Sequence, residues 1–388
     1  MLSRMFELRD KTVFLLSPES WGTMKISKHH YAMELAERNC RVFFIEPPNL
    51  RNKGITIRPC KDHPMISLVS YKPVFRGKRM LPDFIYSRLL WLQVRMLCRK
   101  IGVHPDLVLC FHGYLFEDLR RFGAPVNIYF AADLFNYDHV PPEVRHATFS
   151  LAVSDTIYQR IAESGRPVHR IKHGVPRIFA ESAEKALTAL HPHHPKERIT
   201  AGYAGNLRME AMDRDTIMEV IRRNEDVRFV FWGSYKSNEL NLGGLQTEET
   251  DNFIRFLEQS PNVELRGVLD TARLHTEMSE ADLFWLCLKL GSRRMWDGSN
   301  SHKILEYLST GRPVVAHHVS SYKDTGLLYM MPDNDNARYP ELFREVVELV
   351  KQGEGSKLVE GRLKAAISNS YSIQLNRIEE IIRGTIDS

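Results

Sequence analysis

Three small polar residues stand immediately before a predicted amphipathic helix over His302–Thr310, and this arrangement could bind a diphosphate. Residues of these types cap helix N-termini, where unpaired amides and the positive end of the helix dipole attract anions. Glu306 lies further along the helix, where a carboxylate can accept hydrogen bonds from both ribose hydroxyls. The spacing therefore predicts a nucleotide site, with a plain surface helix carrying a Lys303–Glu306 ion pair as the alternative. The three capping residues are Ser299, Asn300 and Ser301.

A second polar group follows the apolar run Thr200–Ala204, which predicts a buried strand. Gly205 and Asn206 form a turn at its end, and Arg208 comes two residues later. A guanidinium beside a departing diphosphate would stabilise the negative charge that develops as a bond to it breaks. We therefore expect Arg208 to act in catalysis, with a solvated loop arginine as the alternative.

The first half of the chain also places polar residues directly after predicted strands. His112 follows the apolar run Asp106–Phe111, and Asp133 follows Asn127–Ala131. Ligands of doubly wound sheets bind beyond the carboxyl ends of the strands, so both side chains are expected near a substrate hydroxyl. Gly22 and His29, which follow the first apolar run, are expected on the acceptor side of the site.

These residues need elements to position them, and the sequence predicts two doubly wound α/β halves. Short apolar runs alternate with helix-length amphipathic segments throughout, which is typical of βαβ units. A polar His- and Pro-rich stretch interrupts this alternation at Ala189–Glu197. We therefore predict a first domain over 1–178, a linker over 179–198, a second domain over 199–370 and a C-terminal helix over 371–388.

Composition and charge limit the classes of function. The 388 residues, 43% of them hydrophobic, suffice for two buried cores. Neither a signal peptide nor a membrane-spanning segment is evident, and the five cysteines form no zinc or disulfide pattern. These features predict a cytoplasmic protein. His191, His193 and His194 are expected in a solvated linker, not around a metal.

The first half carries a strong positive charge. Residues 51–100 contain twelve Lys and Arg against only Asp62 and Asp83, and aromatic residues are interleaved with the basic ones. This composition favours contact with anionic lipid headgroups, so we expect peripheral association with the inner face of the cell membrane. A solvated loop followed by a core helix is the alternative. No nucleic-acid-binding motif is present, so nucleic acid is not an expected partner.

The segment around the predicted helix resembles the donor-binding signature of GT-B glycosyltransferases, in particular the retaining family 4 enzymes. In its N-terminal stretch, through Arg41–Glu46, the chain also resembles the glycosyltransferases of teichuronic acid and exopolysaccharide synthesis. The resemblance implies an α/β fold of two Rossmann-like domains that face a central cleft, with the last helix packing back on the first domain. The positions that fit the signature are Lys303, Glu306, Tyr307, Leu308, Gly311, Arg312, Pro313, Val314 and Val315.

The resemblance also implies roles for the site residues. Glu306 would hold the donor ribose, and the amides that follow Gly298 would face the diphosphate together with Gly205 and Asn206. The family has a glutamate that contacts the transferred sugar where this chain has Gly298, so Asp297 is the candidate to replace it. The family also has arginine where this chain has Asn206.

The function implied is transfer of a sugar from a nucleotide-diphosphate donor to a glycan or lipid-linked acceptor in surface polysaccharide synthesis. No cofactor or metal is expected, because a helix dipole and an arginine can stabilise the diphosphate. Two alternatives share this architecture: a nucleotide-sugar 2-epimerase and a catalytically silent nucleotide-sugar-binding subunit.

Overall fold

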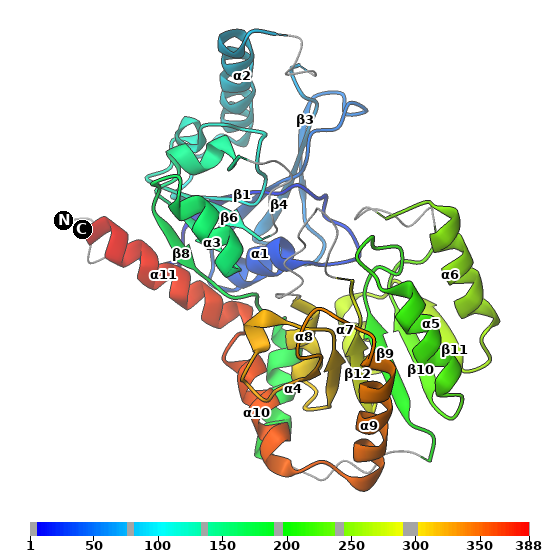
Figure 1. Cartoon of the computed structure of the whole chain (residues 1–388). Helices are drawn as coiled ribbons and strands as arrows, with labels where there is room; N and C mark the ends of the chain where they lie inside the picture. The colour runs from blue at the N-terminus through cyan, green and yellow to red at the C-terminus, as the bar shows by residue number, and fades with distance from the viewer. Residues whose placement is uncertain are drawn as a thin grey trace. The chain divides into compact units, whose positions relative to one another are not determined.

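The protein's computed structural model describes residues 6–75, 81–132, 139–189, 197–236, 244–289 and 302–387. The chain divides into two compact units, each with its own hydrophobic core (Figure 1). Unit 1 comprises residues 1–172 and 371–388, and unit 2 comprises residues 173–370. Both are α/β units built on a largely parallel sheet.

Unit 1 has a mixed sheet. Its strands are β1 (Thr12–Leu16), β2 (Arg41–Ile45), β3 (Ile55–Pro59), β4 (Ile66–Tyr71), β5 (Leu107–Cys110), β6 (Val126–Ala131), β7 (Phe149–Ala152) and β8 (Val168–Arg170). Their order across the sheet is β3-β4-β2-β1-β5-β6-β7-β8. The central strands β1 and β5 are buried along their whole length, as expected for strands covered by helices on both faces.

One edge of this sheet departs from the parallel arrangement that the sequence predicts. Strand β3 pairs antiparallel with β4, with Ile57 opposite Val69. The connection between them is only six residues long, too short for the crossover that parallel neighbours need. This hairpin lies in the basic stretch 51–100, for which a solvated loop followed by a core helix was the alternative to a membrane contact.

Four α-helices flank this sheet among the described residues, and the last one comes from the end of the chain. They are α1 (Ser27–Glu37), α2 (Asp83–Ile101), α3 (Asp155–Ala162) and α11 (Tyr371–Asp387). Helix α11 runs along α1 (Figure 1), and its Leu375 and Ile378 belong to the core of unit 1. Arg38 on the α1 side donates hydrogen bonds to Ser372 O at 2.8 Å and to Asn376 Oδ1 at 2.6 Å.

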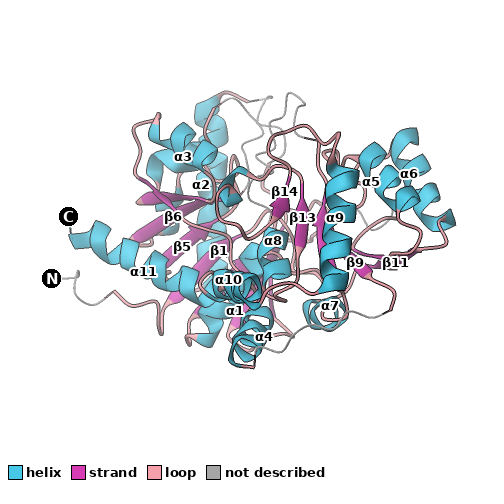
Figure 2. Cartoon of the chain, turned by 60° about the horizontal axis from the view of Figure 1, so that its bottom comes forward, coloured by secondary structure: helices cyan, strands magenta, loops and turns pink. Residues whose placement is uncertain are grey.

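Unit 2 has a fully parallel sheet. Its strands are β9 (Thr200–Ala204), β10 (Arg228–Trp232), β11 (Val263–Gly267), β12 (Leu283–Leu286), β13 (Val314–Ala316) and β14 (Tyr329–Met330). Their order is β11-β10-β9-β12-β13-β14. The helices are α4 (Arg177–Thr188), α5 (Arg214–Arg223), α6 (Glu248–Gln259), α7 (Thr271–Met278), α8 (His302–Leu308), α9 (Tyr339–Gln352) and α10 (Ser356–Ile367). Helices α4 and α10 lie side by side (Figure 2).

The boundary between the units lies at 172/173, not at 178. The first half of the stretch 179–198, which was expected as a linker, belongs to α4, whose Phe179 is fully buried in the core of unit 2. The ring of Phe179 also packs edge-on against His275 of α7 at a centroid distance of 4.9 Å. Helix α4 is therefore part of the folded unit 2. The sequence pattern alone did not show whether this segment packs in a core or forms a linker.

Candidate functional site

Two glycines bring the turns after β9 and β10 together at the carboxyl edge of the unit 2 sheet. The amide of Gly205 donates to Trp232 O at 2.8 Å. A Cβ atom at Gly233, whose φ is +133°, would lie 1.9 Å from Gly205 O. No other residue could occupy position 233 without moving the Gly205 turn. Asn206 holds the backbone that follows Gly205, because its Oδ1 accepts a hydrogen bond from Arg208 N at 2.9 Å.

Tyr307 attaches helix α8 to the end of β9. Its hydroxyl accepts a hydrogen bond from Ala204 N at 2.8 Å and donates one to Ala204 O at 3.2 Å. The ring stacks on Phe284 at a centroid distance of 4.6 Å. The helix carrying Glu306 is thereby docked where the Gly205 turn begins.

Glu306 presents a nearly buried carboxylate beside this turn. Its side chain is 8% exposed, and Oε2 lies 3.1 Å from Lys303 Nζ. A carboxylate has about four lone-pair sites, and Lys303 is its one ion-pair partner among the described residues, which leaves acceptor capacity for further donors. Glu306 is therefore held in position by Lys303 with lone pairs that hydroxyl donors could use.

Arg208 is buried, and its guanidinium is already engaged. Nε donates to Leu245 O at 3.2 Å, Nη1 donates to Tyr235 O at 3.4 Å, and Nη2 is paired with Asp251. The pairing with Asp251 was not evident from the sequence, because 43 residues separate the two partners. A phosphate that binds Arg208 would have to share or replace the Asp251 carboxylate.

Several predicted site residues lie outside the described residues. In unit 2 these are Asp297, Ser299, Asn300 and Ser301, and in unit 1 Asp133. Helix α8 is described from His302 onward, so the amides expected to face a diphosphate remain a prediction. His191, His193 and His194 also lie outside. Within the described ranges, no three His, Cys, Asp or Glu side chains gather closely enough to hold a metal ion.

His112 lies directly after β5 and is partly buried. Its Nδ1 lies 3.0 Å from Gly113 O, and burial lowers its pKa below 6.5, so the neutral ring is favoured. A neutral imidazole can exchange a hydrogen bond with a hydroxyl. The structure is therefore compatible with the expected role, which remains a prediction.

The loop after His112 is held by a carboxylate that sequence analysis missed. Glu143 is fully buried and accepts hydrogen bonds from four consecutive amides: Tyr114 N at 2.9 Å, Leu115 N at 2.8 Å, Phe116 N at 2.8 Å and Glu117 N at 3.1 Å. Tyr114 and Glu117 have positive φ, a conformation in which these amides converge on one point. Glu143 thus fixes the conformation of the loop beside His112.

His29 was expected on the acceptor side, but the structure places its ring in the core of unit 1. The residue is 1% exposed and stacks on Phe44 at a centroid distance of 5.2 Å. Its Nδ1 accepts from Ile26 N at 3.2 Å, which leaves Nε2 to donate to Ser20 O at 3.2 Å. His29 therefore shapes the loop after β1. Gly22, at the exposed tip of that loop, accepts a hydrogen bond from Lys25 Nζ at 2.6 Å.

The buried His29 should make the stability of unit 1 depend on pH. Burial lowers its pKa from 6.5 to about 4, so the unfolded chain takes up the proton first as pH falls. Stability is therefore present above pH 6.5 and is lost between there and pH 4. We expect His29 to account for a loss of about 2 kcal/mol between pH 7 and pH 5.

Urea unfolding of the wild type and of His29→Gln at these two pH values would measure this loss. The variant should lose about 2 kcal/mol less than the wild type, and replacing the exposed His104 with glutamine should change nothing. Equal pH dependence in His29→Gln and wild type would mean that the His29 ring is accessible to protons in the folded state.

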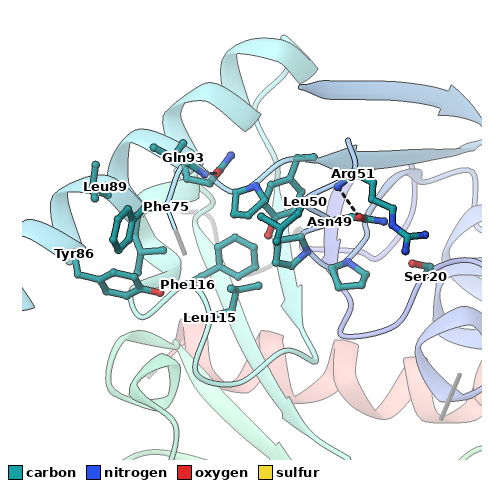
Figure 3. A pocket seen from close by; sticks show the side chains of 16 residues that line it. Ser20, Asn49, Leu50, Arg51, Phe75, Tyr86, Leu89, Gln93, Leu115 and Phe116 are labelled. Atoms are coloured by element: carbon teal, nitrogen blue, oxygen red, sulfur yellow. Dashed lines mark hydrogen bonds between the residues drawn. The ribbon is translucent and has the colours of Figure 1, made fainter. Parts of the chain in front are cut away.

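Unit 1 contains a cavity of about 600 Å³ at the carboxyl edge of its sheet (Figure 3). It is bounded by the segments that follow β1, β2, β4 and β5 and by one face of α2. This is the edge at which α/β sheets bind ligands. The cavity contains none of the predicted site residues of unit 1. Its walls include Ser20, Asn49, Arg51, Phe75, Tyr86, Leu89, Gln93, Leu115 and Phe116.

No protein-family model matches the sequence, and no curated protein is similar to it. The structure nevertheless resembles solved structures along nearly their whole length. An α,α-trehalose 6-phosphate synthase from Burkholderia multivorans has a TM-score of 0.66 at 11% identity, covering 97% of this chain and 99% of the other. A sucrose-phosphate synthase from Thermosynechococcus elongatus has the same scores and coverage.

A third similar structure is HepE of Anabaena in complex with UDP and glucose. Its TM-score is 0.60 at 13% identity, and the match covers 97% of this chain and all of that one. Identities this low show a shared fold. The chain therefore has the GT-B fold, an α/β fold of two Rossmann-like domains, as the sequence predicted.

Proposed function

We propose that this protein is a glycosyltransferase that moves a sugar from a nucleotide-diphosphate donor to a hydroxyl of a lipid-linked glycan acceptor in surface polysaccharide synthesis. The observation that carries the proposal is Glu306, a nearly buried carboxylate on a helix that Tyr307 docks to the end of β9. Two similar structures support the donor class: an E. coli protein described as bound with UDP-2-fluoro glucose, and HepE with UDP.

In this proposal, unit 2 holds the donor. Glu306 binds the ribose, and the turn at Gly205 and Asn206 faces the diphosphate together with the residues before α8. The bond between the anomeric carbon and the diphosphate oxygen breaks as the acceptor oxygen bonds to that carbon. The acceptor proton passes to the departing phosphate oxygen, and configuration is retained. His112 and Asp133 orient hydroxyl groups, and no metal takes part.

A catalytically silent nucleotide-sugar-binding subunit is a second candidate, and the pairing of Arg208 favours it. The Arg208 guanidinium is committed to Leu245, Tyr235 and Asp251, so less of its charge is available to a departing diphosphate. Gly298 and Asn206, where the resembling family has glutamate and arginine, point the same way.

Thermal unfolding with UDP, GDP and ADP tests both candidates, because a ligand that binds only the folded state raises its stability. The stabilising nucleotide would then be supplied as its sugar conjugates together with a bacterial lipid extract. Release of nucleotide that depends on the extract supports the transferase. Binding without any turnover supports the silent subunit. If none of the three nucleotides stabilises the protein, both the transferase and the silent subunit are contradicted.

We also propose that the protein is cytoplasmic and binds the inner membrane surface through the outward face of α2. The described residues contain no helix long and apolar enough to cross a membrane. Helix α2 exposes Phe84 and Trp91, which are 70% and 48% accessible, beside three arginines without an ion-pair partner among the described residues. Aromatic and basic side chains on one helix face suit an anionic lipid surface. The arginines are Arg88, Arg95 and Arg99.

Liposome flotation tests this contact. Wild-type protein should float with vesicles that contain phosphatidylglycerol and stay behind with neutral ones. Replacing Arg95 and Arg99 with alanine should weaken the binding about tenfold or more, since each basic residue near such a surface contributes about 1 kcal/mol. The matched control replaces Arg255 and Arg273, two exposed arginines of unit 2. Equal recovery with neutral and anionic vesicles would remove the membrane contact from the proposal.

A further inference from the structure

The cavity of unit 1 has two chemically different ends. One end is lined by the rings of Phe75, Tyr86 and Phe116 and by the aliphatic side chain of Leu89 (Figure 3). The other end carries Ser20, Asn49 and Arg51, with the Arg51 guanidinium pointing toward Ser20 (Figure 3). A ligand that matches both ends has an apolar part and a polar head.

Gln93 gives the cavity wall an unused hydrogen-bond donor. Its Oε1 accepts from Val74 N at 2.7 Å, which fixes the orientation of the amide. The residue is only 4% exposed, and its buried Nε2 has no hydrogen-bond partner among the described residues. The hydroxyl of Tyr71, another wall residue, is also buried without a partner. Both atoms lie behind the cavity surface, so a ligand with hydrogen-bond acceptors would pair with them only where the wall side chains turn toward it.

The charge around the polar end favours an anion. Arg51 is exposed, and among the described residues only its backbone amide makes a hydrogen bond, to Asn49 Oδ1 at 2.9 Å. The neighbouring Lys53 and Lys72 are basic as well, and Asp62 is paired with Lys25 at 2.7 Å. A guanidinium in such surroundings binds phosphate through charge-assisted hydrogen bonds.

We propose that this cavity binds an amphipathic phosphate ester, with its hydrocarbon chain between α2 and Phe116 and its phosphate at Arg51. The volume of about 600 Å³ falls within the range of small-molecule sites. The inference rests on the proposed function, in which this ligand would be the lipid end of the acceptor. It locates that acceptor away from Gly22 and His29, where the sequence suggested it.

Helix α2 allows the cavity and the membrane face to be tested separately. Leu89 and Gln93 face the cavity, whereas Leu92 and Arg99 are exposed on the helix surface and line no part of it. A tryptophan at position 89 would fill the cavity, and the same change at position 92 would leave the cavity untouched. Arg51→Ala is matched by Arg255→Ala in unit 2, because each removes one exposed arginine.

Calorimetric titration with farnesyl phosphate, farnesol, inorganic phosphate and glucose 6-phosphate tests the inference. The wild type should bind farnesyl phosphate at least tenfold more tightly than the other three ligands. Leu89→Trp should abolish the binding and Arg51→Ala should weaken it about tenfold, with Leu92→Trp and Arg255→Ala within twofold of wild type. Thermal unfolding without ligand would show that the variants are folded.

Three results would overturn the inference: farnesyl phosphate binding that Leu89→Trp leaves intact, farnesol binding as tightly as farnesyl phosphate, or glucose 6-phosphate binding as tightly as the lipid. The last would assign the cavity to a sugar phosphate. Titration with UDP in parallel separates this inference from the proposed function. Binding of UDP without binding of farnesyl phosphate would support the proposed function and contradict this site. Binding of farnesyl phosphate without binding of UDP would support the site and contradict the proposed function.

Discussion

Glu306→Ala is expected to weaken nucleotide binding about a hundredfold while the protein remains folded. The carboxylate is proposed to accept two ribose hydroxyl hydrogen bonds, and a hydrogen bond to a charged group contributes about 1.5–3 kcal/mol. With UDP at 100 times the wild-type Kd, ligand stabilisation should fall from about 2.7 kcal/mol to about 0.4 kcal/mol. Thermal unfolding with and without UDP measures both quantities.

Two controls sharpen this result. Glu306→Gln preserves the shape of the side chain and one acceptor oxygen, so its UDP affinity should lie between those of wild type and Glu306→Ala. Glu345→Ala removes an exposed carboxylate from α9 of the same unit and should leave UDP binding unchanged. UDP affinity within twofold of wild type in Glu306→Ala would contradict the ribose assignment and, with it, the observation on which the proposed function depends.

Glu143→Ala is expected to destabilise unit 1 by about 3–5 kcal/mol. The substitution removes the buried carboxylate that accepts four hydrogen bonds from the amides of Tyr114–Glu117. Those amides then lose this hydrogen-bond acceptor. For a unit of this size the loss corresponds to a fall of roughly 10 °C in the midpoint of its thermal transition. Differential scanning calorimetry measures that transition.

Glu143→Gln separates the loss of charge from the loss of shape. Its one carbonyl oxygen can still accept from Leu115 and Phe116, but its amide group would face Tyr114 N as a second donor. Its stability should therefore fall between those of wild type and Glu143→Ala. An unchanged transition in Glu143→Ala would show that the loop after His112 is held by other contacts.

Most of the strands could be predicted, because buried parallel strands are continuous apolar runs; β3, β4 and β14 are the exceptions. The strand predicted over Thr200–Ala204 has the same bounds in the structure. The helix of Glu306 could be predicted from its small polar residues before His302 and Gly311 after it. At Gly311 φ is +73°, the conformation that ends a helix.

The Lys303–Glu306 pair could be predicted from its spacing on one helix, but partners that are distant along the chain could not. Arg208 is paired with Asp251, and Glu143 accepts from amides that precede it by 26 to 29 residues. No local periodicity encodes such pairs, since they depend on how loops from different strands meet. His29 illustrates the same limit: two adjacent histidines at a helix start suggest that one of them packs, but not which one or that its ring stacks on Phe44.

Helix α11 has a consequence for the order in which the protein acquires its structure during synthesis. Unit 1 is formed by two stretches of chain with the whole of unit 2 between them, and its core includes Tyr371, Leu375 and Ile382 from the second stretch. A ribosome therefore completes residues 173–370 before unit 1 has all of its apolar surface covered. Until α11 has been synthesised, the surface of α1 that it covers remains exposed to water and to chaperones.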